Sequence, residues 1–100
     1  SPPFDFVYLD AAKGQYLANL EALLPLLADG AMLVADDIFH DGLLNQPWTE
    51  IPRRQRTIVK RLQEFLARLQ QPPFYDTRIE ATGNGMVIAR FRKEFVNDHQ

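Results

Sequence analysis

Short apolar runs along the chain predict strands. Phe4–Leu9 is apolar, aromatic and β-branched with almost no polar alternation, which is typical of a strand buried on both faces of a parallel sheet. Residues 31–35 predict a second short buried strand. Residues 75–80 alternate, the glycines within residues 83–85 turn the chain, and the apolar run Met86–Phe91 follows. We therefore expect a closing antiparallel hairpin.

Longer stretches with apolar residues at helical spacing predict helices. The first stretch contains Tyr16, Leu17, Leu20, Leu23, Leu24 and Leu27. Pro25 removes an intrahelical hydrogen bond and predicts a kink or a tightened last turn, and the pair Asp29 and Gly30 predicts the end of this helix. The second helix is predicted over residues 53–70, and the two prolines at residues 72–73 prevent its continuation.

The predicted elements follow the order strand, helix, strand, loop, helix and hairpin. Residues 38–52 contain glycine, proline and asparagine without a period and are predicted to be the loop, and residues 97–100 a frayed tail. A strand, a helix and a strand with short links form a right-handed βαβ unit. No element covers the apolar strand Phe4–Leu9, which alone would be an exposed edge. We therefore predict an α/β unit that is half of a larger open sheet.

Composition narrows the function. A chain of 100 residues with 46% apolar and 24% charged residues is typical of one globular unit. The net charge of −2 argues against indiscriminate binding to nucleic acid or acidic membranes. The longest apolar stretch, residues 23–28, is far short of the roughly 20 residues of a membrane span, so we expect no membrane partner. The absence of cysteine excludes disulfides and thiolate sites and permits a cytoplasmic location, which we expect.

Carboxylates follow both predicted parallel strands. Asp10 comes directly after Leu9, and Asp36 and Asp37 follow the second strand. Ligands of open α/β sheets bind outside the carboxyl ends of strands, and neighbouring strands lie about 4.8 Å apart, so these side chains can converge on one ion. Oxygen ligands select a hard cation, with Mg²⁺ as first choice and Mn²⁺ or Ca²⁺ as alternatives. The alternative interpretation is structural: Asp10 caps the following helix, and Asp36 and Asp37 begin a turn.

Lys13 is a candidate general base. It lies three residues after Asp10, at the mouth of the predicted helix, where the helix dipole disfavours a cation. A neighbouring divalent cation would disfavour the protonated amine further, which leaves a neutral amine that can accept a proton. The alternative is a solvated surface lysine.

Residues 4–16 and 33–37 resemble the cation-dependent, catechol-type O-methyltransferases, which are class I S-adenosylmethionine (SAM) enzymes. The similarity continues through residues 52–60 and 83–85 and so spans nearly the whole chain. Within this family, residues 10–16 and the basic start of the second helix are most similar to bacterial tRNA 5-hydroxyuridine methyltransferases. The resemblance implies SAM and Mg²⁺ as cofactors.

Carried over by position, the resemblance makes Asp10 and Asp36 metal ligands and Lys13 the catalytic base. Asp37 stands where the family usually has asparagine as the third ligand. A third carboxylate would hold the cation, weaken it as an acid toward substrate and favour the protonated form of Lys13, so we expect activity to be altered or lost. The resemblance also places Asp10 and Tyr16 at the cofactor, although Tyr16 is equally well explained as a helix core residue.

The chemistry implied is methyl transfer from a sulfonium to a hydroxyl beside a second oxygen donor, as in catechols or 5-hydroxyuridine in tRNA. Basic residues gather at the start of the second predicted helix: Arg53, Arg54, Arg56, Lys60 and Arg61. At helical spacing Arg53, Arg56 and Lys60 share a face that can touch tRNA phosphates, or a face that is solvated and pairs with glutamates. His40 lies in the loop where substrate would enter, although a loop histidine also simply faces water. The expected substrate contacts are His40, Arg53 and Arg56.

Two features of the family are missing from this sequence. None of the glycines forms a glycine-rich SAM turn after a strand, and the acidic ribose ligand is absent. Of the family's strand order 3-2-1-4-5-7-6, only 4-5-7-6 would be represented. We therefore expect residues 1–100 to be the C-terminal part of one SAM-dependent domain, inactive in isolation. The alternative is a non-catalytic fragment that pairs the edge strand Phe4–Leu9 with another chain, and a homodimer is the expected assembly.

Overall fold

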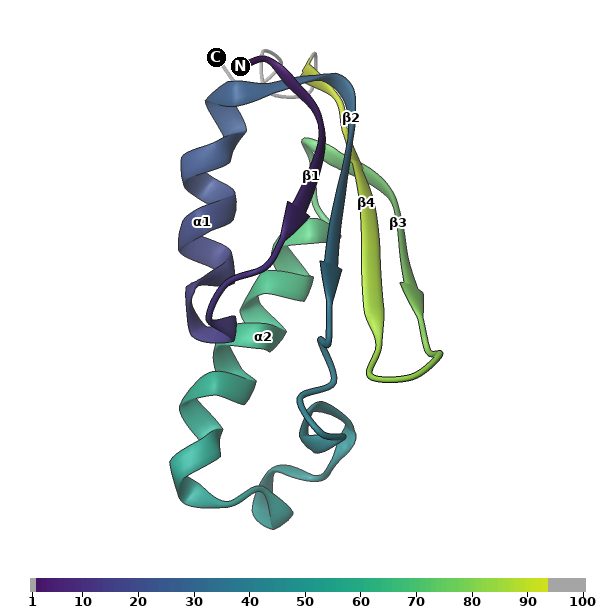
Figure 1. Ribbon diagram of the computed structural model, residues 1–100. Coiled ribbons are helices and arrows are strands. Elements are labelled where there is room, and N and C mark those ends of the chain that lie inside the picture. Colours follow the sequence, from purple (N-terminus) through teal and green to yellow (C-terminus); the bar gives the residue numbers. More distant parts are fainter. Residues whose placement is uncertain (1, 94–100) are drawn as a thin grey trace.

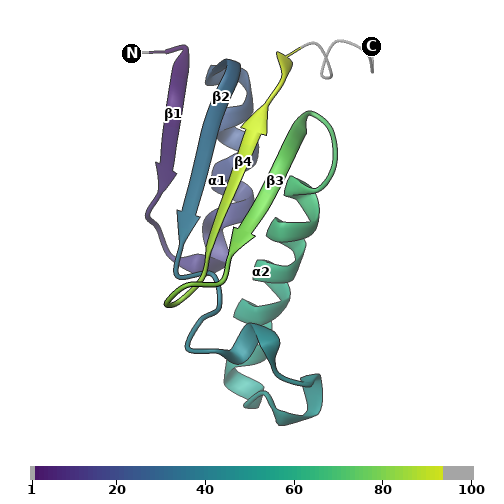
Figure 2. The ribbon, with the colours of Figure 1, turned by 90° about the vertical axis from the view of Figure 1, so that its right-hand side faces the viewer.

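The computed structural model describes residues 2–93 and shows one four-stranded sheet with helices on one of its faces (Figures 1 and 2). The strands are β1 (Phe4–Leu9), β2 (Leu27–Asp36), β3 (Phe74–Glu80) and β4 (Met86–Phe91), and the helices are α1 (Tyr16–Leu23) and α2 (Arg56–Leu69). The predicted α/β class and the closing hairpin are confirmed. The predicted tail, residues 97–100, lies outside the described residues.

The sheet has the order β1-β2-β4-β3. β1 and β2 are parallel and joined through α1, which confirms the βαβ unit, and β4 is antiparallel to both β2 and β3. This is the arrangement 4-5-7-6 expected from the resemblance. The parallel pairing sets Leu9 opposite Ala35, so the carboxyl ends of β1 and β2 lie at the same edge.

The first helix ends earlier than its apolar spacing suggests. α1 stops at Leu23, and Pro25 lies in a 3₁₀ turn over Leu24–Leu26, which confirms the tightened last turn. The prediction that Asp29 and Gly30 end this helix is wrong, because both lie inside β2. Pro25 has already turned the chain there, and the extended backbone from Leu27 onward pairs with β1. Gly30, at φ +79°, lies where the β1–β2 register shifts.

β1 is an edge strand with one open face. Phe6 and Tyr8 are 55% and 47% exposed, whereas Leu9 is buried. The prediction that both faces of this strand are buried is therefore wrong for the described residues, since the helices cover the opposite face of the sheet (Figure 2). The exposed edge expected for Phe4–Leu9 is confirmed.

The core lies between the sheet and α2. The helix buries Val59, Leu62, Phe65 and Leu69 and leaves a polar face outside. Full burial of each such side chain stabilises the fold by about 1.5–3 kcal/mol. A 3₁₀ turn over Arg53–Gln55 precedes α2, so the predicted helix over residues 53–70 is correct to within a turn. Among residues 2–93, neither helix has the length and apolarity needed to cross a membrane.

Candidate functional site

The carboxyl ends of β1 and β2 bring acidic side chains to one edge. Because Leu9 pairs with Ala35, the residues that follow them, Asp10 and Asp36, emerge at the same end of the sheet. The Tyr8 hydroxyl donates to Oδ2 of Asp36 at 3.2 Å and links the two strand ends. Oδ1 of Asp36 accepts the backbone N–H of Asp37 at 2.7 Å.

Lys13 is held at this edge by partners from the loop after β2. Its Nζ lies 2.9 Å from Oδ2 of Asp37 and 3.0 Å from Nδ1 of His40. The Lys13 side chain is only 19% exposed, so it is not the solvated surface lysine of the alternative interpretation. The Asp37 side chain is 46% exposed, and an ion pair so open to water contributes only about 0–1 kcal/mol to stability. Its main effect is on where the amine lies.

His40 links Lys13 to the start of α2. Its second ring nitrogen, Nε2, lies 2.8 Å from Oε1 of Gln55. The histidine therefore does not simply face water. Sequence reasoning missed Gln55, whose only signal is an uncharged residue among the arginines at positions 53, 54 and 56. The predicted contact of His40 with substrate stays a prediction.

The loop after β2 contains residues in the left-handed backbone region. Asp37, His40 and Asp41 have φ values of 54°, 50° and 57°. Each non-glycine residue held there costs about 1–3 kcal/mol unless its surroundings compensate. Such strain is common where side chains must point in a fixed direction. Here the strained residues Asp37 and His40 are the two that contact Lys13.

The β3–β4 turn holds this loop in place. The N–H of Ile38 donates to the carbonyl of Gly85 at 3.2 Å, and that of Phe39 donates to the carbonyl of Asn84 at 3.0 Å. Gly85 has φ +82°, and a Cβ built there would lie 2.7 Å from the Phe39 ring. Only glycine fits this close approach, so the predicted turn over residues 83–85 also positions the site.

Asp37 offers a buried acceptor. Its Oδ1 atom has no hydrogen-bond partner among the described residues, although almost none of its surface reaches solvent. A carboxylate oxygen in that condition suits a hard cation. However, no group of three or more histidine, aspartate or glutamate side chains within residues 2–93 is placed to hold a metal ion. The structure therefore brings the predicted ligands Asp10, Asp36 and Asp37 to one edge without forming a closed ligand set.

Tyr16 lies in the core beneath the site. Its ring packs against Phe65 with centroids 5.3 Å apart, and the residue is buried. Burial is the main cause that raises the pKa of Tyr16, and the charges of Asp10 and Asp37 raise it further. The core interpretation of Tyr16 is thus correct, and its predicted cofactor contact stays a prediction.

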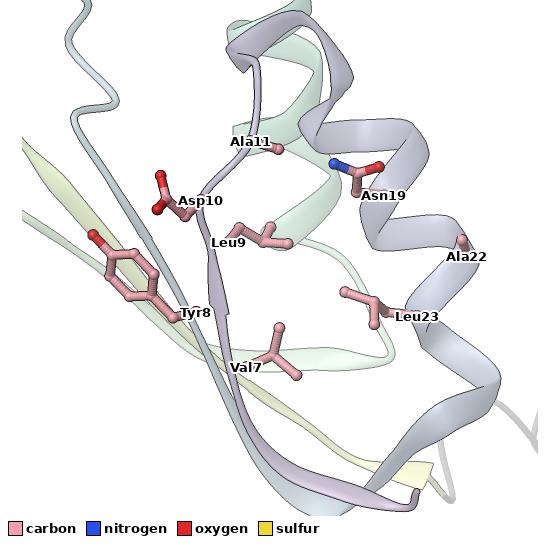
Figure 3. Close-up of a pocket in the computed structure, with 8 residues that line it drawn as sticks. All are labelled: Val7, Tyr8, Leu9, Asp10, Ala11, Asn19, Ala22 and Leu23. Atoms are coloured by element: carbon pink, nitrogen blue, oxygen red, sulfur yellow. The ribbon is translucent and has the colours of Figure 1, made fainter. Parts of the chain in front are cut away.

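An open hollow of about 440 Å³ lies beside Asp10, between β1 and α1 (Figure 3). Val7 and Leu9 face it from the strand, and Leu23 faces it from the helix, whereas Tyr8 points to the other side of β1. The remaining lining residues are Ala11, Asn19 and Ala22. The predicted cofactor role of Asp10 stays a prediction, and its place beside an apolar hollow suits that role.

The basic residues at the start of α2 divide into two groups. Arg56 donates from Nε to the carbonyl of Ile51 at 3.0 Å, and its guanidinium lies 5.4 Å from the centre of the Trp48 ring. Arg56 therefore stabilises the segment that precedes α2 rather than facing outward. The others are exposed, and none forms an ion pair with a carboxylate in the described part of the chain: Arg53, Arg54, Lys60 and Arg61. Pairing with glutamates, the alternative interpretation, is not seen there.

Comparison with known proteins adds independent evidence. A protein-family model described as O-methyltransferase matches residues 1–92. The chain is 31% identical over 87 residues to Tapetum-specific methyltransferase 1 of Arabidopsis thaliana, covering 87% of this chain and 37% of that protein. It is 30% identical over 91 residues to caffeoyl-CoA O-methyltransferase of Petroselinum crispum, covering 87% of this chain and 36% of that protein. The chain thus spans little more than a third of the length of these curated relatives.

Solved structures share the fold. An O-methyltransferase from Bacillus cereus in complex with SAH gives a TM-score of 0.68 at 22% identity, over 92% of this chain and 42% of that chain. The O-methyltransferase TomG from Streptomyces achromogenes, in complex with SAM, gives a TM-score of 0.69 at 23% identity, over 92% and 41%. These likenesses show that the chain shares the fold of these structures.

Proposed function

Because this chain belongs to the O-methyltransferase family, we propose that it supplies the catalytic edge of a SAM-dependent enzyme that methylates a hydroxyl oxygen. The observation that carries the proposal is the placement of Lys13. Its amine is held between Asp37 and His40 at the carboxyl ends of β1 and β2. In an open α/β sheet this is the edge at which ligands bind.

Lys13 would act as the general base. The substrate hydroxyl gives its proton to Nζ of Lys13, the oxygen forms a bond to the methyl carbon, and the bond from that carbon to the sulfonium sulfur breaks. A positioned base contributes typically about 10²–10⁴-fold to the rate of such a step. The 19% exposure of the Lys13 side chain suits this role, because few waters compete for the amine.

A divalent cation forms part of the proposal. Asp10, Asp36 and Asp37 would hold it, and the buried Oδ1 of Asp37, which has no donor within residues 2–93, supports this assignment. Because Oδ2 of Asp37 is taken by Lys13, the two oxygens of one carboxylate would serve the metal and the base separately. When bound, the cation would acidify and orient the substrate hydroxyl.

The proposed substrate carries a hydroxyl beside a second oxygen donor. A 5-hydroxyuridine in tRNA is one candidate, supported by the exposed cations Arg53, Arg54 and Lys60 in α2 and in the turn before it. A small molecule is the other, supported by the relative named for caffeoyl-CoA. Labelled methyl transfer to a catechol and to tRNA containing 5-hydroxyuridine would distinguish these two substrates.

The assembly and location are also proposals. We propose that the chain is the C-terminal part of a methyltransferase domain in the cytoplasm and that it is inactive in isolation. We also propose that it forms a homodimer. The open edge of β1, with Phe6 and Tyr8 exposed, supports its pairing with a further strand.

The test is a hybrid in which this chain replaces the matched residues of Tapetum-specific methyltransferase 1. We expect SAM-dependent methyl transfer, a loss of about 10²-fold or more in Lys13→Met, and little change in Lys93→Met, a matched control at an exposed lysine. A hybrid that folds and binds SAM but transfers no methyl group would overturn the proposal, as would full activity of Lys13→Met.

A further inference from the structure

We propose that Asp37 and His40 form a two-acceptor clamp that aims the lone pair of Lys13, and that Gln55 sets this clamp by fixing the tautomer of His40. The proposal rests on the proposed function, because it concerns how the base of that reaction is positioned. Its geometry comes from three contacts: Lys13 lies 2.9 Å from Asp37 and 3.0 Å from His40, and His40 lies 2.8 Å from Gln55.

The contacts leave one assignment for the protons of His40. The Lys13 ammonium can only donate, so Nδ1 of His40 accepts from it. The Oε1 atom of Gln55 can only accept, so Nε2 of His40 carries the hydrogen and donates it. A neutral imidazole has one acceptor and one donor nitrogen, and both are used here. Gln55 therefore selects the tautomer that Lys13 requires.

Two acceptors fix the direction of the amine. An ammonium has three hydrogens, and here one points to Oδ2 of Asp37 and one to Nδ1 of His40. When the third proton leaves, the neutral amine still donates to both acceptors, so its lone pair points along the remaining direction. With only one acceptor, the amine would rotate about its Cε–Nζ bond and sweep the lone pair through many directions. The clamp removes that freedom before substrate binds.

The backbone explains why the clamp keeps its shape. His40 is in the left-handed region, at φ 50°, in the loop fastened to the β3–β4 turn through Phe39. Gln55 directly precedes α2, and its N–H donates to the carbonyl of Pro52 at 2.8 Å. Lys13 comes from the 3₁₀ turn before α1. Three segments of the chain thus meet at His40, which contacts both Lys13 and Gln55.

The first test reads the tautomer directly. Long-range ¹H–¹⁵N spectra of this chain at alkaline pH, where an ordinary imidazole is neutral, distinguish protonated from unprotonated ring nitrogens. The sequence contains only two histidines, and the His40→Gln variant assigns the signals of His40 by their loss. We expect a protonated Nε2 and an unprotonated Nδ1. In Gln55→Leu only the contact with Lys13 still favours this tautomer, so we expect a detectable share of the Nδ1-protonated form, with no change in the control Gln46→Leu, an exposed glutamine. A protonated Nδ1, or an unchanged tautomer in Gln55→Leu, would overturn the proposal.

The second test reads the amine. We expect the side-chain order parameter at Cε of Lys13 to fall in His40→Leu toward the value of the exposed Lys60. In His40→Asn, whose amide oxygen can take the place of Nδ1, we expect recovery toward the wild-type value. Asp41→Asn, a change at an exposed neighbour, controls for general effects on the loop. Equal order in all four proteins would contradict the clamp.

These readings need no catalysis, so they separate the two proposals. If a hybrid has the expected tautomer and an ordered amine but transfers no methyl group, the clamp is supported and the proposed function is overturned. If the hybrid is active and its His40→Leu variant keeps full kcat, the clamp is overturned and the proposed function stands. If both proposals hold, kcat falls about tenfold in His40→Leu with little change in the KM for substrate.

Discussion

The Nζ atom of Lys13 lies 2.9 Å from Oδ2 of Asp37, so the loop after β2 is tied to the turn before α1. This contact joins the segments that follow β1 and β2, at the edge where these parallel strands end. Asp37 also takes the place of the asparagine that the resemblance leads one to expect there. Substitutions of Asp37 can separate the effect of its side-chain charge on stability from the effect of its backbone conformation.

Replacing Asp37 tests that separation. In Asp37→Asn we expect the free energy of unfolding to change by less than about 1 kcal/mol, because the ion pair is partly exposed and asparagine tolerates the left-handed region. In Asp37→Val we expect a loss of about 1–3 kcal/mol, because a β-branched residue is strained at φ 54°. Urea denaturation measures both changes, and equal losses in the two variants would refute this account.

Gly85 provides a second stability test. We expect Gly85→Ala to destabilise the fold by about 2–4 kcal/mol, because the new Cβ would meet the Phe39 ring at 2.7 Å and the backbone is left-handed. Gly83→Ala is the matched control, since Gly83 is also left-handed, at φ +62°, but no atom of residues 2–93 lies within 4 Å of the new Cβ. Its expected loss is about 1 kcal/mol. If thermal unfolding shows no difference between the variants, the close approach of Phe39 is unimportant.

Tyr16 predicts a pH dependence at the alkaline end. Burial first, and then the charge of Asp10, raises its pKa in the folded chain above the ordinary value of 10.0. The unfolded chain then loses the Tyr16 proton at lower pH than the folded chain, so stability is fully present below about pH 10 and falls as pH rises above it. We expect Tyr16→Phe to fall less steeply in urea titrations across this range. An equally steep fall in Tyr16→Phe would contradict this account.

The open edge of β1 predicts association. If the proposed homodimer forms there, sedimentation should show a concentration-dependent dimer that Phe6→Lys weakens by about tenfold or more. A charge on an exposed edge strand opposes pairing with another strand. Ile79→Lys changes an equally apolar exposed position on β3, the opposite edge, and should leave the dimer intact. If Ile79→Lys weakens the dimer more than Phe6→Lys does, the interface lies at β3 and not at β1.

Local patterns predicted the fold well where one chemical preference dominated. The apolar stripe of α2 and the alternation before the turn at residues 83–85 are short-range signals, and the structure has both elements. Asp29 and Gly30 gave the wrong signal, because a glycine that ends a helix and one that allows a strand irregularity have the same backbone freedom. Only the earlier turn at Pro25 separates the two cases.

The site was predictable only in part. Asp10, Asp36 and Lys13 each follow a recognisable strand or precede a helix, so topology alone brings them to one edge. Gln55 could not be found in this way, because its role depends on a contact with His40 across 15 residues of irregular loop. No periodicity encodes such a contact. The exposed face of β1 was missed for a related reason, since apolar residues predict burial without showing whether a partner is present.

The dependence of the loop after β2 on the β3–β4 turn has a consequence for biosynthesis. A nascent chain that has left the ribosome only as far as residue 82 already contains the acids, the lysine and the histidine of the site, but it lacks the carbonyls of Asn84 and Gly85 that hold the loop. Its side chains would therefore be present before they are arranged. The arrangement of this edge therefore waits for the β3–β4 turn, which is made after every one of these side chains.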